Sequence, residues 1–300
     1  MPDNLVRPSN RQIGPFSVGP LALGCWRLTG NEVSESTRLI ETALDLGMNL
    51  IDNADVYGLD WGGSGFGSCE EMLGKVLTGS PQLRDRMVLA TKGGILPPTP
   101  YDQSPTYLRK ACEDSLRRLN VETIDLYQIH RPDLFAHPGD VAAVLTELRS
   151  EGKIREVGVS NFTQSQHETL QSFLSFPIVA SQPQFSAAHL EPMRDGVFDW
   201  CLRNNSIPLA WSPLGGGSLL SGEGVRSELI EVLDSLADRE GVDRATIAIA
   251  FVLTHPSAPV AILGTQKPDR LASAAKALDV TLTRDDCYQI VVASEGVPLP

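Results

Sequence analysis

The stretch Asn49-Leu50-Ile51-Asp52-Asn53-Ala54-Asp55-Val56-Tyr57 decides the fold. Its apolar residues Leu50 and Ile51 lead directly into an acid, Asp52, and a tyrosine follows five positions after that acid. A buried strand ends where its polar residues begin, so we expect Asp52 at the carboxyl end of a short strand and Tyr57 on the loop above it. Taken alone, this pattern also fits a core acid and a packing tyrosine. The same pattern recurs along the chain, where an apolar run ends in one chemically useful residue.

The other apolar runs have the length and composition of buried strands. We expect these strands at residues 21–24, 88–91, 124–129, 157–159, 178–180, 208–210 and 260–263. Continuous apolar runs are typical of parallel strands that are buried on both faces. The sequence therefore favours a parallel sheet that is covered by helices.

Helical segments alternate with these strands. Amphipathic periodicity or a proline in the first helical position predicts helices near residues 34–46, 105–119, 141–149, 198–202, 225–239, 245–253, 268–278 and 284–293. Two capping boxes predict further helix starts, one at Ser68 with Glu71 and one at Thr163 with Gln166.

Eight strands that alternate with helices in a chain of 300 residues predict a (β/α)8 TIM barrel with parallel strands. A doubly wound sheet is the alternative arrangement of the same units. We expect residues 1–300 to form a single domain, with a loose tail at residues 1–10. A short N-terminal hairpin should close one end of the barrel, and an extra C-terminal helix should pack outside it.

Composition excludes several classes of partner. The net charge is −12 and the chain has no run of lysine and arginine, which argues against nucleic acid and anionic membranes. The five cysteines are widely spaced and form no C-x-x-C pair, so we expect reduced thiols in a cytoplasmic protein, and no metal site. We find no signal-peptide core at the N-terminus and no apolar run of bilayer-spanning length.

Four residues follow neighbouring strands and have a shared chemical interpretation. Lys92 follows the strand at 88–91, and His130 follows the strand at 124–129. Asp52 and Tyr57 both stand at the end of the strand that contains Leu50 and Ile51. Alone, a lysine after a strand is usually a solvated loop residue, and a histidine there is often structural. In a barrel, however, the carboxyl ends of all strands meet at the face that carries the active site. We therefore expect these four side chains to share one pocket.

The chemistry of this set is proton transfer to a carbonyl oxygen. A phenol has an ordinary pKa of about 10, and a neighbouring ammonium lowers that value. An acid paired with the lysine keeps the ammonium charged, and a histidine can orient the substrate oxygen. Because no protein side chain donates hydride, reduction at the carbonyl carbon requires a cofactor.

With these residues the sequence resembles the aldo-keto reductase superfamily. The matching motifs are DNADVYG at 52–58, TK at 91–92, DLYQIH at 125–130 and GVSNF at 158–162. The resemblance covers residues 21–278, and the run HRPD at 130–133 is most similar to a bacterial branch of aldo/keto oxidoreductases. It implies an NADP(H)-dependent enzyme that interconverts a carbonyl compound and its alcohol.

The resemblance also implies roles for individual residues. Tyr57 would be the proton donor, Lys92 and Asp52 would tune it, and His130 would orient the carbonyl. The segment 264–270 would hold the adenosine 2′-phosphate, although relatives often place an amide where this chain has Ala274. The positions assigned to NADP(H) are Gly24, Cys25, Trp26, Asp52, Ser160, Asn161, Gln182, Trp211, Ser212, Leu214, Gly215, Gly264, Thr265, Gln266, Lys267 and Arg270. Among these, Trp211 would stack on the nicotinamide ring.

The substrate pocket is less determined by the sequence. We expect a fairly open site, because the short C-terminal tail lacks aromatic residues and the loop 58–67 is long and rich in glycine. The side chains expected to shape it are Trp26, Trp61, Phe66 and Phe135, together with the loop 216–221. The glycines at 62–67 do not have the spacing of a dinucleotide-binding fingerprint, so we do not interpret them as a phosphate loop.

Two other functions remain open at this point. A lysine at a barrel strand end can form a Schiff base with a carbonyl substrate, so Lys92 would also suit a lyase. The barrel would alternatively be a non-catalytic module that binds the cofactor and regulates a partner. The partner that we expect is a small carbonyl or alcohol substrate, and the sequence leaves the oligomeric state undetermined.

Overall fold

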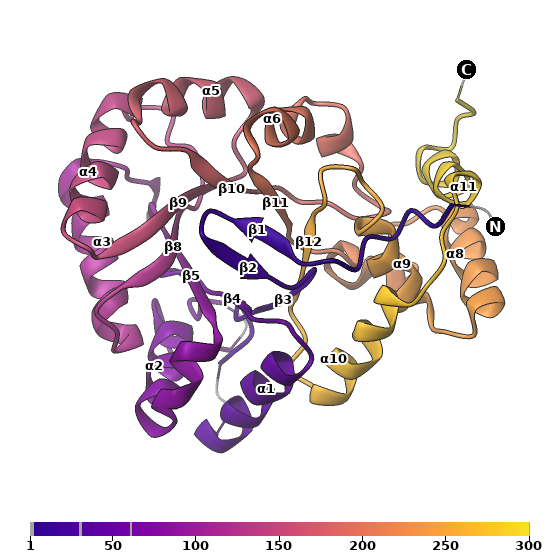
Figure 1. Ribbon diagram of the computed structural model, residues 1–300, viewed down its shortest axis with the longest axis horizontal. Coiled ribbons are helices and arrows are strands. Elements are labelled where there is room, and N and C mark those ends of the chain that lie inside the picture. The colour runs from indigo at the N-terminus through magenta and orange to yellow at the C-terminus, as the bar shows by residue number, and fades with distance from the viewer. Residues whose placement is uncertain (1–2, 30–31, 61, 300) are drawn as a thin grey trace.

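A closed barrel of eight parallel strands forms the centre of the molecule, and helices surround it (Figure 1). The computed structural model describes residues 3–29, 32–60 and 62–299. The barrel strands are β3 Leu21–Gly24, β4 Leu50–Asp52, β5 Val88–Gly93, β8 Ile124–Ile129, β9 Ile154–Ser160, β10 Ile178–Gln182, β11 Ile207–Ala210 and β12 Val260–Leu263. Strand β12 pairs with β3 and closes the ring. The predicted TIM barrel is thus confirmed, and the doubly wound alternative is excluded.

Helices follow the strands and shield their outer faces. They are α1 Val33–Asp45, α2 Ser68–Gly79, α3 Pro105–Leu119, α4 Pro138–Ser150, α5 Gln164–Phe173, α6 Val197–Asn204, α7 Ser218–Ser221, α8 Ser227–Glu240, α9 Arg244–Val252, α10 Pro268–Ala275 and α11 Arg284–Glu295. Short 3-10 turns lie at Pro81–Arg86, Glu191–Met193, Gly215–Gly217 and Lys276–Leu278. Along the described chain, no helix is long and apolar enough to cross a membrane.

Two short hairpins stand outside the barrel wall. Strands β1 Arg11–Ile13 and β2 Phe16–Val18 pair antiparallel across the amino-terminal end of the barrel, as predicted. Ile13 and Val18 are fully buried in the same apolar cluster as the inward side chains of the barrel strands. The hairpin therefore plugs this end with apolar groups. The second hairpin, β6 Ile95–Leu96 with β7 Thr99–Tyr101, follows β5.

The strand alternation separates an inner core from an outer one. In β8, Leu126 points into the barrel, whereas Tyr127 and Ile129 pack among the helices. This is the period-2 pattern of a strand with both faces buried. The inner core is apolar near the hairpin and becomes polar toward the carboxyl ends of the strands, where Asp52 and Lys92 are buried.

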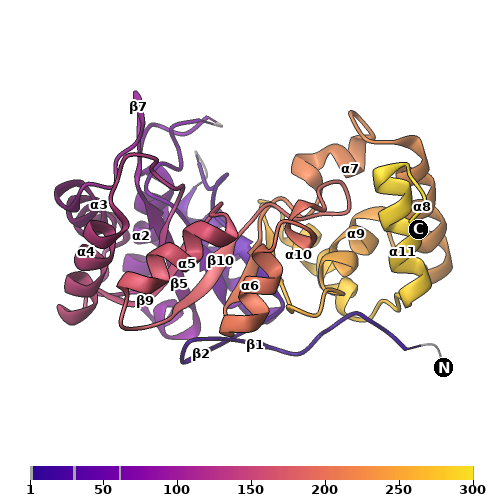
Figure 2. The same cartoon turned by 90° about the horizontal axis from the view of Figure 1, so that it is seen from above.

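The end of the chain extends the fold to one side of the barrel. Helix α11 packs on α8 rather than on a strand, as Figure 2 shows. Arg239 of α8 holds Asp286 of α11 through two hydrogen bonds of 2.7 and 3.1 Å. The prediction of an extra C-terminal helix outside the barrel is correct.

The prediction that residues 1–10 form a loose tail is wrong for the residues that the structure describes. The backbone N–H of Leu5 donates to Leu282 O at 2.8 Å, and that of Arg7 donates to Leu253 O at 3.2 Å. Val6 is buried between these bonds. The segment is held because it runs beneath the C-terminal helices (Figure 2). Sequence polarity alone did not reveal that contact.

One of the two predicted capping boxes forms. Thr163 accepts a hydrogen bond from the Gln166 N–H, and the Gln166 side chain accepts one from the Thr163 N–H. The predicted box of Ser68 with Glu71 does not form. Gly67 takes the N-cap position of α2 with φ 85°, so Ser68 is the first helical residue and no side chain caps the helix.

We expect Gly74→Ala in α2 to lower the unfolding temperature, although alanine is the better helix former. A Cβ atom at Gly74 would lie 2.0 Å from the carbonyl oxygen of Arg118 in α3, and overpacking of this kind costs about 1–3 kcal/mol. Gly79 in the same helix is the matched control, because a Cβ there meets no atom within 4 Å. Thermal unfolding of both variants by circular dichroism tests this. An equal or higher midpoint for Gly74→Ala would contradict the close packing of α2 on α3.

Candidate active site

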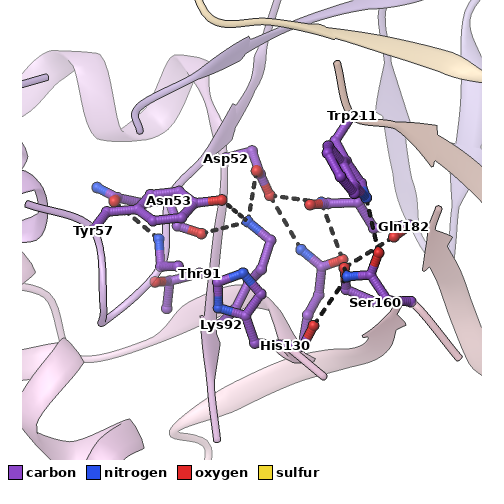
Figure 3. A network of polar contacts seen from close by, with 12 residues as sticks. Asp52, Asn53, Tyr57, Thr91, Lys92, His130, Ser160, Gln182 and Trp211 are labelled. Carbon is purple, nitrogen blue, oxygen red and sulfur yellow. Dashed lines mark hydrogen bonds and ion pairs between the residues drawn. The ribbon is translucent and has the colours of Figure 1, made fainter. Parts of the chain in front are cut away.

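Four predicted residues meet at the carboxyl ends of three adjacent strands (Figure 3). Asp52 is the last residue of β4, Lys92 lies near the end of β5, and His130 directly follows β8. Tyr57 lies on the turn between β4 and α2, and its ring meets that of His130 edge-on at 5.7 Å. The register of the parallel strands brings together side chains that are far apart in the sequence.

Lys92 is the centre of this set. Its side chain is fully buried, and its ammonium donates to Asp52 Oδ2 at 2.7 Å, to the Asn53 carbonyl at 2.7 Å and to the Tyr57 hydroxyl at 3.3 Å. Burial alone lowers the pKa of Lys92, but Asp52 and Tyr57 raise it above its ordinary value overall. The amine is therefore held in the charged form, which cannot attack a carbonyl carbon. This arrangement disfavours a Schiff-base lyase.

Tyr57 is a protonated phenol in this environment. Burial raises its pKa above the ordinary value, and the neighbouring Lys92 ammonium acts against burial by lowering it. The sequence predicted the lowering by Lys92 but not that burial outweighs it, because burial of the phenol depends on the packed loop. A phenol that keeps its proton, with an ammonium beside it to stabilise the phenolate, is suited to general acid catalysis.

His130 presents a neutral imidazole to the same space. Burial lowers the pKa of His130 well below its ordinary value, and the charges of Lys92 and Arg131 act in the same direction. Its Nδ1 atom is buried and has no hydrogen-bond partner among the described residues. Because His130 also lines the cavity, its neutral imidazole can orient an oxygen of a bound molecule.

A second set of polar side chains lies beside the first, at the carboxyl ends of β9, β10 and β11. Asn161 donates to Ser160 Oγ at 2.7 Å and accepts from the Trp211 indole N–H at 3.0 Å. Gln182 donates to Asp52 Oδ1 at 3.0 Å, so the two sets form one hydrogen-bonded network. Asn161 has φ 58°, in the left-handed region that asparagine tolerates better than most residues. Its side chain is thereby directed toward Trp211.

A cavity of about 930 Å³ connects these groups to the last barrel helix. Of the residues assigned by sequence, those that line the cavity are Gly24, Trp26, Asp52, Tyr57, His130, Ser160, Asn161, Gln182, Trp211, Ser212, Leu214, Gly264, Thr265 and Arg270. Cys25 is buried behind the wall, and Gly215, Gln266 and Lys267 do not line the cavity either. The size suits a dinucleotide with a small substrate, because ligand cavities of about 300–1,000 Å³ are typical.

Two of the predicted substrate-pocket residues lie elsewhere. Phe135 is 98% exposed, and Phe66 does not line the cavity but packs under the Arg118 guanidinium at 5.8 Å. An aromatic residue on a loop carries no sequence signal for the direction in which it points, and this explains both errors. Trp61 lies outside the described residues. The predicted loop 216–221 contributes Gly216, Gly217 and Leu220 to the cavity.

Sequence reasoning missed a group of cavity residues on α8 and α9. Arg244 holds Asp234 through two hydrogen bonds of 2.6 and 2.5 Å and donates to the Leu220 carbonyl at 3.2 Å. It thus pins the loop that borders the cavity. Asp243, the N-cap of α9, also lines it. In the sequence, charged residues such as Asp234 and Arg244 look like solvated positions on helices. Only Asp243 had a recognisable sequence pattern, that of a helix N-cap.

Arg27, Asp60 and Arg131 were also missed, and they line the cavity near the four central residues. Trp26 donates its indole N–H to Asp60 Oδ1 at 3.1 Å. The Arg131 guanidinium lies 5.9 Å from the Trp211 ring centroid. In the parts of the chain that the structure describes, no group of three or more His, Cys, Asp and Glu side chains could hold a metal ion.

Comparison with known proteins agrees with this geometry. Residues 20–295 match the model of the aldo/keto reductase family. The 6-dehydroglucose reductase of Novosphingobium aromaticivorans is 46% identical over 305 residues and covers 100% of both chains. That of Agrobacterium fabrum is 32% identical, with 94% of this chain and 96% of the relative covered. The solved structure of glycerol dehydrogenase from Gluconobacter oxydans is similar with a TM-score of 0.83 at 29% identity, over 98% and 97% of the two chains.

The burial of neutral His130 predicts a pH dependence of stability. Histidine protonates near pH 6.5 in an unfolded chain, whereas the pKa of folded His130 is lowered. Below pH 6.5 the unfolded state binds more protons, so stability falls as the pH falls toward the folded pKa, by up to about 1.4 kcal/mol per pH unit.

We therefore expect acidification from pH 7.5 to 5 to lower the unfolding temperature of the wild type more than that of His130→Gln. His167 and His255, whose pKa values are lowered to about 4, are present in both proteins and cancel in the comparison. Calorimetry at several pH values measures the difference. Parallel curves for the two proteins would show that folded His130 titrates normally.

Proposed function

Because this chain belongs to the aldo/keto reductase family, it is an oxidoreductase, and we propose that it reduces the aldehyde group of a sugar with NADPH as hydride donor. The observation that carries the proposal is the contact of the buried Lys92 ammonium with both Asp52 and the Tyr57 hydroxyl, at one end of the cavity. It supports proton transfer from Tyr57 to a carbonyl oxygen.

The residues that line the cavity fit a nicotinamide dinucleotide. The flat indole of Trp211 would face the nicotinamide ring, and Ser160, Asn161 and Gln182 would bind its carboxamide. Arg270, in the first turn of α10, lines the cavity and would bind the 2′-phosphate through its guanidinium group. When bound, NADPH supplies the hydride that the protein lacks.

The proton is supplied by the chain itself. Tyr57 donates its hydroxyl proton to the carbonyl oxygen as negative charge develops there. Lys92, at 3.3 Å, stabilises the resulting phenolate, and Asp52 fixes the ammonium in place. His130 donates a hydrogen bond to the same oxygen and orients it toward Tyr57, which its neutral state permits. Each group acts on charge that appears only in the transition state, and this is the condition for accelerating the reaction.

The wall next to these groups supports a polyhydroxylated substrate. Trp26 offers an apolar face, and Asp60 and Arg131 offer planar polar groups that would bind neighbouring hydroxyls. A hydrocarbon substrate would cover these groups without giving them hydrogen bonds, at a cost in binding free energy. The identity of 46% with a 6-dehydroglucose reductase over the full length supports the same substrate class, an aldehyde at the terminal carbon of a hexose.

A panel of carbonyl compounds tests the proposal. With NADPH absorbance as the readout, we expect 6-dehydroglucose to be reduced with a kcat/KM at least about 10²-fold higher than that of an unsubstituted aldehyde of equal length, since hydrogen-bonding sites strongly reject analogues that lack hydroxyl groups. NADPH should also quench the fluorescence of Trp211. If the protein oxidises NADPH with none of the compounds, it is not a reductase of this kind. A preference for the unsubstituted aldehyde would contradict the sugar substrate alone.

Tyr57→Phe should preserve cofactor binding while turnover falls by about 10²–10⁴-fold, the usual contribution of general acid catalysis. Lys92→Met should also cripple turnover, because the phenol loses the cation that stabilises its ionised form. Since both residues act as one unit, the double variant should be little worse than either single one. Single-turnover rates of the three variants measure this. Fully multiplied losses would mean that the two residues act independently.

Arg270→Ala should raise the KM for NADPH by about tenfold or more and leave that for NADH nearly unchanged, because a charge-assisted bond to phosphate is lost. Lys267, one turn earlier, is the matched control. It is exposed and does not line the cavity, so Lys267→Ala should have the smaller effect. An equal loss for both cofactors in Arg270→Ala would place Arg270 outside the phosphate site.

A further inference from the structure

An amide side chain lies inside the barrel, between the apolar inner core and the polar ends of the strands. Gln128 of β8 is fully buried, and Leu126, the next inward residue of the same strand, belongs to the apolar inner core. A buried amide destabilises a fold unless hydrogen bonds satisfy it. A leucine at this position would extend the apolar core and avoid that cost. The presence of Gln128 thus calls for an explanation through its partners.

Both partners of Gln128 belong to the active site. Its Nε2 donates to Asp52 Oδ1 at 3.1 Å, and its Oε1 accepts from Gln182 Nε2 at 3.4 Å. Gln182 donates to the same Asp52 oxygen at 3.0 Å. The three side chains therefore form a closed triangle of hydrogen bonds. Asp52 Oδ2 remains for Lys92, at 2.7 Å (Figure 3).

The neighbouring strands fit around this amide. Lys92 of β5 and Gly158 of β9 are the register partners of Gln128 on its two sides. A Cβ atom at position 158 would lie 3.0 Å from Gln128 Cγ and 3.1 Å from the Ala180 carbonyl oxygen. The glycine leaves room for the amide side chain to cross the barrel interior toward Asp52.

We propose that Gln128 is a positioning residue that holds Asp52 and Gln182 as one rigid unit. Gln182, on the cofactor side of the site, and Asp52, on the proton-donating side, then keep a constant position relative to each other. The inference rests on the proposed function. Gln182 lines the cavity where the carboxamide would bind, and Asp52 fixes Lys92 beside Tyr57. Gln128 touches neither substrate nor Tyr57 and acts through these two side chains.

Gln128→Leu removes both hydrogen bonds and keeps most of the volume. We expect kcat to fall about tenfold or more, because a hydrogen bond to a charged group is lost. The dissociation constant of NADPH, measured by tryptophan fluorescence, should rise several-fold because Gln182 loses its support. The KM for the carbonyl substrate should change little, since His130 and the cavity wall are intact. If Gln128 had no positioning role, Gln128→Leu would leave both kcat and the NADPH dissociation constant at their wild-type values.

Gln128→Glu provides the decisive readout, a pH-dependent rescue. When protonated, the carboxyl donates to Asp52 and accepts from Gln182, as the amide does. Two carboxylates in contact cannot both ionise easily, so the introduced acid keeps its proton at low pH and loses it as the pH rises. The ratio of variant to wild-type kcat should therefore approach one near pH 5.5 and fall toward pH 8.5. Gln128→Leu should show no rescue at any pH.

Gln171 of helix α5 supplies a control away from the active site. Its amide is hydrogen-bonded to the backbone of Ile178 and Phe176, at the opposite end of β10 from Gln182. Gln171→Glu adds the same charge, and it should leave both the NADPH affinity and the shape of the pH profile unchanged.

Wild-type kcat and NADPH affinity in Gln128→Leu, or a kcat ratio for Gln128→Glu that is constant with pH, would overturn the inference. Failure of the proposed function is distinguishable from this. A wild-type protein that reduces no carbonyl compound would refute the reductase, while the NADPH dissociation constants of Gln128→Leu and Gln171→Leu would still decide the role of Gln128.

Discussion

The full burial of one ammonium group, that of Lys92, is the constraint on which the rest of the site depends. A charged amine out of contact with water is tolerated only when it is paired and hydrogen-bonded. Asp52, the Asn53 carbonyl and Tyr57 supply its three acceptors. Each of them comes from the end of β4 or the turn after it. The strand, the turn and the proton donor are therefore fixed by the need to satisfy one cation. The ion pair of Lys92 with Asp52 in turn keeps the ammonium charged.

The barrel makes this burial possible by bringing polar side chains from several strands together at their carboxyl ends. Most backbone N–H and C=O groups of the strands are engaged in the sheet, so the partners in this region are side chains and a few backbone carbonyls, such as that of Asn53. Asp52, Gln128 and Gln182 extend the network from Lys92 across the barrel, and Asn161 and Trp211 continue it through separate bonds. At the opposite end the β1 and β2 hairpin seals the interior with Ile13 and Val18. Polarity is confined to the end that faces the cavity.

The sequence predicts those features of the site that depend on strand ends. Asp52, Lys92 and His130 follow apolar runs, and parallel strands must bring such positions to one face, so their convergence needed no tertiary detail. Side-chain direction on loops has no comparable rule, and Phe66 and Phe135 were misassigned for this reason. Ser68 had the residue type of a helix cap, but the left-handed Gly67 took that position. Gln128 was visible in its motif, yet its role depends on partners in β4 and β10 that only the folded barrel reveals.

The turn that carries Tyr57 is held from its outer side by a second buried set of ionisable groups. Glu70 of α2 accepts from Thr91, the residue before Lys92, at 2.5 Å and from Arg118 of α3 at 2.7 Å. Asp55 donates its backbone N–H to the Lys92 carbonyl at 3.0 Å. Burial and the nearby Glu70 raise the pKa of Asp55 well above its ordinary value, which favours the neutral carboxyl beside Lys92.

Strand β5 is thus fixed on both sides of Lys92, by Asp52 inside the barrel and by Glu70 outside it. The turn from Asn53 to Tyr57 lies between these two anchors and has little freedom to move. Leu59 and Asp60, which follow this turn and line the cavity, lie outside the two anchors. The loop after β4 thus carries both the fixed proton donor and a separate part of the pocket wall.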